Sequence, residues 1–142
     1  MSQMLIVYWS ATGNTEAMAK FIREGAAETG MNVTLKEVTS ASADDVKAVD
    51  IAVFGCPAMG DEILEEEEFE PFMKSVTETL AGKKIGLFGS YDWGDGEWMR
   101  NWESDVKKAG AVLLKEGFIV NLEPEGDDIE KCKAFGRELA GM

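Results

Sequence analysis

The chain has no histidine among its 142 residues, and this absence limits the chemistry that its own side chains can perform. Histidine is the usual base in Ser-His and Cys-His nucleophilic sites and a common zinc ligand. Only two cysteines are present, Cys56 and Cys132, and neither stands in a CxxC or metal-ligand spacing, so we expect reduced thiols and no metal site. Any reaction chemistry is therefore expected to come largely from a bound cofactor.

Basic residues are also scarce. The chain has 14 lysines and arginines against 27 aspartates and glutamates, which gives a net charge of −13. This balance argues against nucleic acid or an anionic membrane as a partner. No apolar run reaches roughly 18 residues, and the first residues lack a basic segment followed by an apolar one, so we expect a cytoplasmic protein. The length and the lack of a linker-like segment predict a single domain over residues 1–142.

Segments with the apolar spacing of a strand alternate along the chain with segments that have the apolar spacing of a helix. Short apolar or alternating runs predict strands at residues 4–9, 33–38, 51–56 and 85–89, and a fifth strand from residues 111–114 together with 117–120. Helical spacing predicts helices at residues 18–26, 44–49, 69–80, 99–109 and 129–139. Strands interleaved with helices predict the α/β class, as a doubly wound five-stranded parallel sheet with helices on both faces.

The stretch Ser10-Ala11-Thr12-Gly13-Asn14-Thr15 lies between the first predicted strand and the first helix. Hydroxyls, a side-chain amide and free backbone N–H groups at a helix N-terminus attract anions. The stretch has no lysine, which the Walker A loop needs, and it lacks the three spaced glycines of the dinucleotide fingerprint. A phosphate cradle without a cation points to flavin mononucleotide (FMN). The competing interpretation is that Thr12 or Asn14 merely caps the helix.

Two further loops are expected to meet this stretch in one pocket. Ligands of doubly wound sheets bind beyond the carboxyl ends of the strands, at the switch point, which is the place where the order of the strands reverses direction. The loops at residues 57–62 and 90–96 follow the third and fourth predicted strands. They carry Met59, Tyr91 and Trp93 in Gly-rich surroundings that no core periodicity explains, and such side chains suit a flat ring.

Three segments together resemble the short-chain flavodoxins, particularly those of anaerobic bacteria, over essentially the whole chain. These segments are Tyr8-Trp9-Ser10-Ala11-Thr12-Gly13-Asn14-Thr15-Glu16, Ala58-Met59-Gly60-Asp61-Glu62 followed by Phe69-Glu70-Pro71-Phe72, and Gly89-Ser90-Tyr91-Asp92-Trp93-Gly94-Asp95-Gly96. The resemblance implies the strand order 2-1-3-4-5 and non-covalently bound FMN. It also implies a low-potential one-electron carrier that shuttles between semiquinone and hydroquinone, with no substrate of its own.

The resemblance further implies the role of individual residues. Met59 packs on the inner face of the isoalloxazine and Trp93 on the outer face, and Glu62 accepts a hydrogen bond from flavin N3–H. The phosphate is held by Ser10, Thr12, Asn14 and Thr15, with Trp9 beside it. The full set of residues expected to contact FMN is Trp9, Ser10, Ala11, Thr12, Gly13, Asn14, Thr15, Pro57, Ala58, Met59, Gly60, Asp61, Glu62, Ser90, Tyr91, Asp92, Trp93 and Gly94.

Two of these positions depart from the pattern of the family. Pro57 stands where some relatives have a serine near the ribityl chain, so one sugar contact is expected to be missing. Asp92 occupies a turn position where relatives can have glycine.

Gly60 has an implied role in reduction. In the resembling family the peptide between Gly60 and Asp61 turns over when the flavin takes one electron, so the Gly60 carbonyl can accept from flavin N5–H. Glycine allows a positive φ cheaply, whereas a side chain costs roughly 1–2 kcal/mol there. We therefore expect Gly60 to favour the neutral semiquinone.

The acidic residues suggest how the carrier meets its partners. Two interpretations apply to the acidic group formed by Asp61, Glu62 and residues 65–68. It is either a solvated acidic face or a docking surface beside the flavin edge. The second interpretation predicts redox partners with basic docking surfaces, such as ferredoxin-type reductases and other oxidoreductases, and a monomeric carrier.

Four other functions compete with that of an electron carrier. A phosphoryl-accepting receiver domain shares the topology, but it needs acidic residues where this chain has Trp9-Ser10 and Cys56-Pro57. A small FMN-dependent reductase would need a substrate cavity over a ring that Met59 and Trp93 are expected to cover. An activator of a ribonucleotide reductase also works through its flavin and stays open. A flavin-free binding module would stay colourless with added FMN.

Overall fold

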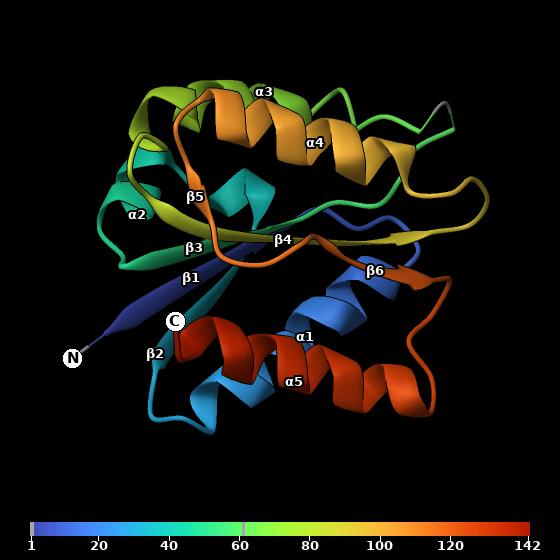
Figure 1. Ribbon diagram of the computed structural model, residues 1–142. Helices are drawn as coiled ribbons and strands as arrows, with labels where there is room; N and C mark the ends of the chain where they lie inside the picture. The colour runs from blue at the N-terminus through green and yellow to red at the C-terminus, as the bar shows by residue number, and fades with distance from the viewer. Residues whose placement is uncertain (1, 61) are drawn as a thin grey trace.

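The computed structural model describes residues 2–60 and 62–142, and its centre is a parallel β-sheet (Figure 1). The strands run in the order β2 (Asn32–Glu37), β1 (Gln3–Tyr8), β3 (Ile51–Gly55) and β4 (Lys84–Tyr91), and β4 pairs with both β5 (Val112–Leu113) and β6 (Phe118–Asn121). The helices are α1 (Asn14–Ala27), α2 (Ala43–Lys47), α3 (Phe69–Val76), α4 (Glu97–Lys108) and α5 (Asp127–Ala140), with short 3₁₀ helices η1 (Val38–Ser40) and η2 (Thr77–Thr79). The predicted fold and strand order are confirmed.

The fifth strand of the prediction is split into two pieces. β5 pairs with Lys84 and Ile85, whereas β6 pairs with the segment of β4 from Phe88 to Tyr91. Between them, the Gly117 N–H donates to Glu103 Oε2 of α4 at 2.6 Å instead of joining the ladder. An α4 side chain therefore engages the backbone at the break, which the apolar pattern of the sequence does not reveal.

Successive residues of the inner strands face opposite sides of the sheet. Met4, Ile6 and Tyr8 of β1 pack with α1 and α5, whereas Leu5 and Val7 pack with the cluster that contains α2, α3 and α4. Figure 1 shows these two helical layers on either side of the sheet. Burial on both faces explains why the central strands read as continuous apolar runs.

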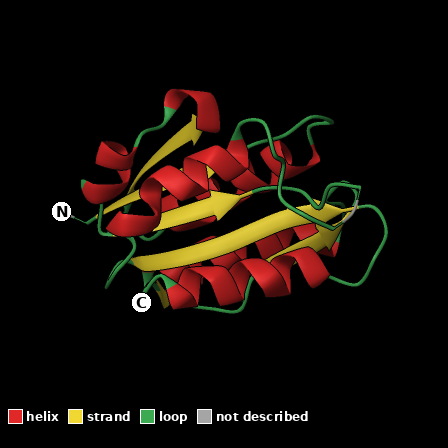
Figure 2. Cartoon of the chain, turned by 90° about the horizontal axis from the view of Figure 1, so that it is seen from above, coloured by secondary structure: helices red, strands yellow, loops and turns green. Residues whose placement is uncertain are grey.

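Glycines allow the two helices beneath the sheet to cross closely. A Cβ atom at Gly25 of α1 would lie 1.9 Å from the Lys133 carbonyl oxygen, and one at Gly136 of α5 would lie 2.1 Å from the Ile22 carbonyl oxygen. This contact fixes α1 against α5, and with it the N-terminal end of α1 at the carboxyl edge of the sheet. Figure 2 shows the loops that gather at that edge.

Both cysteines are free, as the sequence predicts, and both are also buried. Burial raises the pKa of Cys56 and of Cys132 to about 12, so both thiols stay protonated. Among the described residues, no helix is long and apolar enough to cross a membrane.

Candidate functional site

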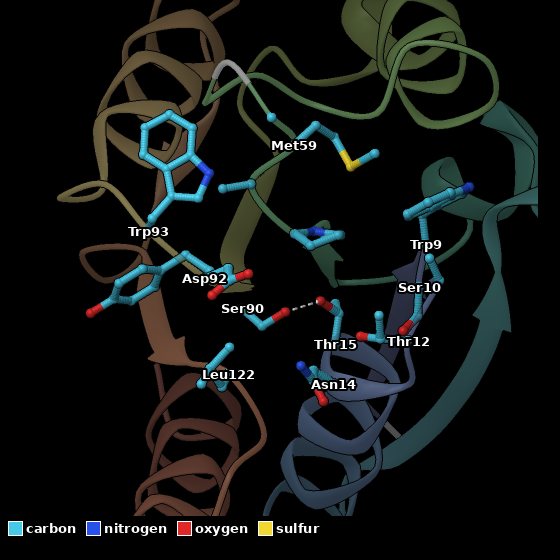
Figure 3. Close-up of a pocket in the computed structure, with 15 residues that line it drawn as sticks. Trp9, Ser10, Thr12, Asn14, Thr15, Met59, Ser90, Asp92, Trp93 and Leu122 are labelled. Carbon is cyan, nitrogen blue, oxygen red and sulfur yellow. Dashed lines mark hydrogen bonds between the residues drawn. The ribbon is translucent and has the colours of Figure 1, made fainter.

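One pocket lies at the carboxyl edge of the sheet, where loops from four strands converge (Figure 3). Its volume is about 380 Å³, within the range of small-molecule sites. The lining residues are Trp9, Ser10, Ala11, Thr12, Asn14, Thr15, Pro57, Ala58, Met59, Gly60, Ser90, Tyr91, Asp92, Trp93 and Leu122. The three predicted loops therefore meet, and a fourth segment after β6 joins them.

The first loop forms a helix N-terminus that no side chain caps. Gly13 is the N-cap residue of α1 with φ at +97°, and its N–H donates to Ser10 Oγ at 3.1 Å. The interpretation that Thr12 or Asn14 caps this helix is wrong, because α1 has no side-chain cap hydrogen bond. The left-handed conformation at Gly13 turns the chain into the helix and leaves the amides of its first turn without a capping side chain.

Thr15 ties this loop to the third loop. It is buried, and its Oγ1 lies 2.8 Å from Ser90 Oγ, a hydrogen bond that Figure 3 marks with a dashed line. A hydroxyl in this bond keeps further hydrogen-bonding capacity, since it can donate once and accept twice. Thr12 is exposed and Asn14 half-buried, and both line the pocket.

Larger side chains form the other end of the pocket. Met59 is half-buried, whereas the Trp93 indole is 61% exposed. Tyr91 is half-buried and its ring packs against Trp98, with 5.9 Å between the ring centroids. Trp93 and Met59 come from different loops and border the same space in Figure 3.

Leu122 is a lining residue that the sequence reasoning missed. It has φ at +59° and its N–H donates to the Tyr91 carbonyl at 2.8 Å. The neighbouring Asn121 side chain donates to the carbonyls of Tyr91 and Asp92, each at 3.2 Å. The segment after β6 therefore braces the third loop. The same rule that selects loops after the other strands could have found it.

Among the described residues predicted for the cofactor, Gly13, Glu62 and Gly94 do not line the pocket. Gly13 is the N-cap residue of α1 within the first loop, and Asp61 falls outside the described residues. Glu62 is 9% exposed with φ at +52°, and its Oε1 accepts from the Gly96 N–H at 3.3 Å. A Cβ at Gly94 would lie 2.4 Å from this oxygen. The Glu62 carboxylate therefore links the second loop to the third.

Glu65 is not part of an acidic surface, contrary to the interpretation of residues 65–68 as one exposed group. It is 6% exposed, and its carboxylate accepts from the N–H groups of Glu67, Glu68 and Phe69, each at 2.8 Å. Burial alone raises the pKa of Glu65, but the three donors outweigh it and hold the pKa below its ordinary value. Glu65 thus satisfies the N-terminus of α3.

The remaining members of this group are exposed, and one of them contacts the site. Glu66, Glu67 and Glu68 are all solvent-accessible, and Glu68 Oε1 accepts from Trp9 Nε1 at 3.0 Å. This bond holds the indole that borders the first loop.

The chemistry of the pocket fits FMN. Neutral donors surround a helix N-terminus at one end, and no lysine or arginine lines the pocket within the described part of the chain. Apolar and aromatic side chains border the other end. A molecule with a phosphate at one end and a flat ring at the other matches both halves.

Comparisons with known proteins agree with this match. A family model described as Flavodoxin matches residues 6–136. The chain is 45% identical over 139 residues to a flavodoxin of Clostridium beijerinckii, covering 98% of this chain and 100% of the relative. It is 44% identical over 135 residues to a flavodoxin of Megasphaera elsdenii, covering 95% and 96%. The solution structure of two-electron reduced M. elsdenii flavodoxin is similar with a TM-score of 0.90, over 98% of this chain and 99% of that chain.

Proposed function

This chain belongs to the flavodoxin family, and from that membership we propose which of its residues hold the cofactor and which meet the redox partner. The chain is an FMN-binding electron carrier rather than an enzyme, so neither a reductase with its own substrate nor a ribonucleotide reductase activator is favoured. Bound FMN supplies the chemistry, because its ring accepts and releases one electron at a time. The protein supplies binding, orientation and exclusion of water.

The phosphate is held by the hydroxyls and amides of Ser10, Thr12, Asn14 and Thr15, with Trp9 beside it. The observation that carries this proposal is the uncapped α1 N-terminus at Gly13, bordered by neutral donors. The helix dipole favours an anion there without a cationic side chain.

The ring lies between Met59 and Trp93, with its polar edge toward backbone groups of the second and third loops. The exposed Trp93 indole supports this role, because covering it with a flat ring removes a large apolar surface from water. Glu62 accepts a hydrogen bond from flavin N3–H once its carboxylate has released the Gly96 N–H. Leu122 borders the same space and belongs to this set.

A comparison of FMN with riboflavin, which lacks the phosphate, tests the assignment. Thr12→Val removes an exposed hydroxyl for which the structure shows no protein partner among the described residues, so folding should be unchanged. We expect the variant to bind FMN about tenfold more weakly and riboflavin as well as the unmodified protein does. Flavin fluorescence titration measures both affinities.

Trp93→Ala is the complementary control, and it should weaken both ligands alike. An equal loss of FMN and riboflavin binding in Thr12→Val would refute the role of this loop. A matched change at Thr34, on the exposed edge strand β2, should affect neither ligand.

The docking surface consists of the exposed Glu66, Glu67 and Glu68 and faces partners with basic surfaces, such as ferredoxin-type reductases. These carboxylates adjoin the pocket through the Trp9 to Glu68 hydrogen bond, and the net charge of −13 favours fast, salt-sensitive association. The carrier acts as a cytoplasmic monomer with one domain. The single sheet, with a hydrophobic core on each face, supports the assignment of one domain.

The docking proposal is tested by stopped-flow reduction with such a reductase. Glu66→Gln with Glu67→Gln should slow association about three- to tenfold at low salt, and the difference should vanish at high salt. The control pair, Asp44→Asn with Glu78→Gln on α2 and η2, makes the same charge change away from the pocket. Equal rates for the two double variants would contradict the proposal.

A further inference from the structure

Arg100 stands at an unusual place in its helix. It lies near the start of α4, which begins at Glu97. The positive end of the helix dipole is at that terminus, so a cation is expected in the last turn instead, where Lys107 and Lys108 stand. Arg100 does not line the flavin pocket, and direct contact with the pocket therefore does not explain its place. Its hydrogen-bond acceptors do.

Two hydrogen bonds hold the Arg100 guanidinium on the third loop. Nη2 donates to Asp95 Oδ1 at 2.9 Å, and Nη1 donates to the Asp95 carbonyl at 3.0 Å. The planar guanidinium presents its donors in a fixed fork, so two bonds to one residue restrict its position more than one bond would. Asp95 lies two residues after Trp93, which lines the pocket. A positive charge is therefore held on the loop that borders the ring end of the pocket.

This charge lies close to the Glu62 carboxylate. A Cβ atom at Gly96 would lie 3.6 Å from Arg100 Nη1, and the Gly96 N–H donates to Glu62 Oε1 at 3.3 Å. The guanidinium and the carboxylate are thus neighbours of the same glycine. The hydrogen bond and the charge of Asp95 raise the pKa of Arg100, and the charge of Glu62 adds to this effect, so Arg100 stays protonated. Glu62 is buried, and solvent therefore screens its charge less than that of a surface carboxylate.

The charge of Glu62 has different consequences for oxidised and for reduced flavin. Under the proposed function, on which this inference rests, the Glu62 carboxylate meets the edge of the flavin ring. Fully reduced FMN carries a negative charge on its ring at neutral pH, so the carboxylate repels it. The ring of oxidised FMN is neutral and is not repelled in this way. A cation held near Glu62 offsets the repulsion without touching the flavin.

We propose that Arg100 is a positioning residue that acts through Glu62: held on the third loop by Asp95, its guanidinium offsets the Glu62 charge and so favours the binding of fully reduced FMN over oxidised FMN. Tighter binding of the reduced form shifts the redox equilibrium toward that form. Arg100 thereby makes the fully reduced carrier a weaker reductant than it would be without this side chain.

The affinities of the full chain for oxidised and for fully reduced FMN test this proposal. Fluorescence titration gives the first, and comparing the reduction potentials of bound and free FMN then gives the second. In Arg100→Gln at low salt, we expect the affinity for reduced FMN to fall about two- to threefold more than the affinity for oxidised FMN. The difference should shrink at high salt, because the guanidinium is largely exposed.

Two single variants separate the charge of Arg100 from its shape and from the net charge of the chain. Arg100→Lys keeps the charge and should recover most of the preference for reduced FMN. Arg137→Gln makes the same charge change at an arginine that pairs with Glu28 and Glu130 and does not line the pocket. It should leave the ratio of the two affinities unchanged.

A second background tests whether Arg100 acts through Glu62. In Glu62→Gln the charge that Arg100 offsets is gone, so adding Arg100→Gln should change the ratio of the two affinities much less. The proposal would be overturned by an equal change of both affinities in Arg100→Gln, by an Arg100→Lys variant that behaves like Arg100→Gln, or by an undiminished effect in the Glu62→Gln background. An unmodified protein that binds no FMN would instead refute the flavin site itself.

Discussion

Gly60 occupies an open position at the rim of the flavin pocket. It is exposed, its φ lies outside the left-handed region, and a Cβ atom built there meets no atom within 4 Å. A side chain would therefore fit the conformation that the structure shows. Its cost would arise only if the peptide after Gly60 turned over upon reduction.

Gly60→Thr should accordingly leave the stability of the oxidised protein unchanged and lower its first reduction potential. Strain of roughly 1–2 kcal/mol in the reduced form corresponds to a fall of about 40–90 mV for a one-electron couple. Spectroelectrochemical titration measures the potential, and urea unfolding of the oxidised form checks the stability. An unmoved potential would rule out the peptide rearrangement.

The sequence identified most residues of the pocket wall because the switch-point rule depends only on where strands end. Trp9, Met59 and Trp93 all follow strand ends, and each lines the pocket. The rule could not predict which hydrogen-bond donors the individual carboxylates would contact. Glu62 faces a loop amide and Glu65 a helix end, and both choices depend on backbone donors that only the folded chain brings together.

Among the secondary-structure elements, α3 depends on a residue outside its own span. The helix begins at Phe69, and Glu65 accepts from three N–H groups around that start. An ionised carboxylate stabilises such a terminus through charge-assisted hydrogen bonds and the helix dipole. The lowered pKa of Glu65 links this stabilisation to pH.

Glu65→Gln should lower the free energy of unfolding by about 1–2 kcal/mol at neutral pH. Because the folded-state pKa is lowered, the contribution of Glu65 is present above the unfolded pKa and is lost as pH falls through the folded value. The difference between the variant and the unmodified protein should therefore shrink below about pH 4.

Urea unfolding at several pH values, with a fixed excess of FMN, measures this difference. Glu66→Gln makes the same charge change at an exposed neighbour and should show no comparable loss. A pH-independent difference for Glu65→Gln would mean that its ionised form does not stabilise α3.

The apolar patterns predicted the five α-helices and the strands β1 to β4, but they merged β5 and β6 into one strand and did not give the exact extent of every element. Val38 continues the alternation of β2, yet it lies in η1 and is buried. Leu80 continues the stripe of α3, yet it follows η2 and is buried as well. Both side chains are apolar because they fill the core. A buried apolar residue can therefore continue the pattern of a strand or helix after that strand or helix has ended.

At the scale of the whole molecule, the net charge of −13 acts on the cofactor itself. A phosphate group carries roughly −1.5 to −2 charges at neutral pH, and no cationic side chain lines the pocket within the described residues. Long-range repulsion therefore opposes the short-range attraction of the α1 N-terminus. Salt screens the long-range repulsion more than the attraction by the α1 N-terminus, because the phosphate and the helix amides are in direct contact.

FMN affinity should consequently rise, by roughly three- to tenfold, when NaCl is increased from about 20 mM to about 300 mM. Flavin fluorescence titration gives the dissociation constant at each salt concentration. Riboflavin should show a much smaller change, since it lacks the phosphate. A fall in FMN affinity with salt would indicate that a cation binds the phosphate after all.

The break between β5 and β6 has a consequence for crowded solutions. An uninterrupted outer strand would offer its free amides and carbonyls to another chain, which could extend the sheet from one molecule into the next. Here β5 has two residues and β6 four, and the Gly117 amide between them is already engaged by Glu103. An incoming strand would lose its register after a few residues, so this side of the molecule is protected against edge-to-edge aggregation.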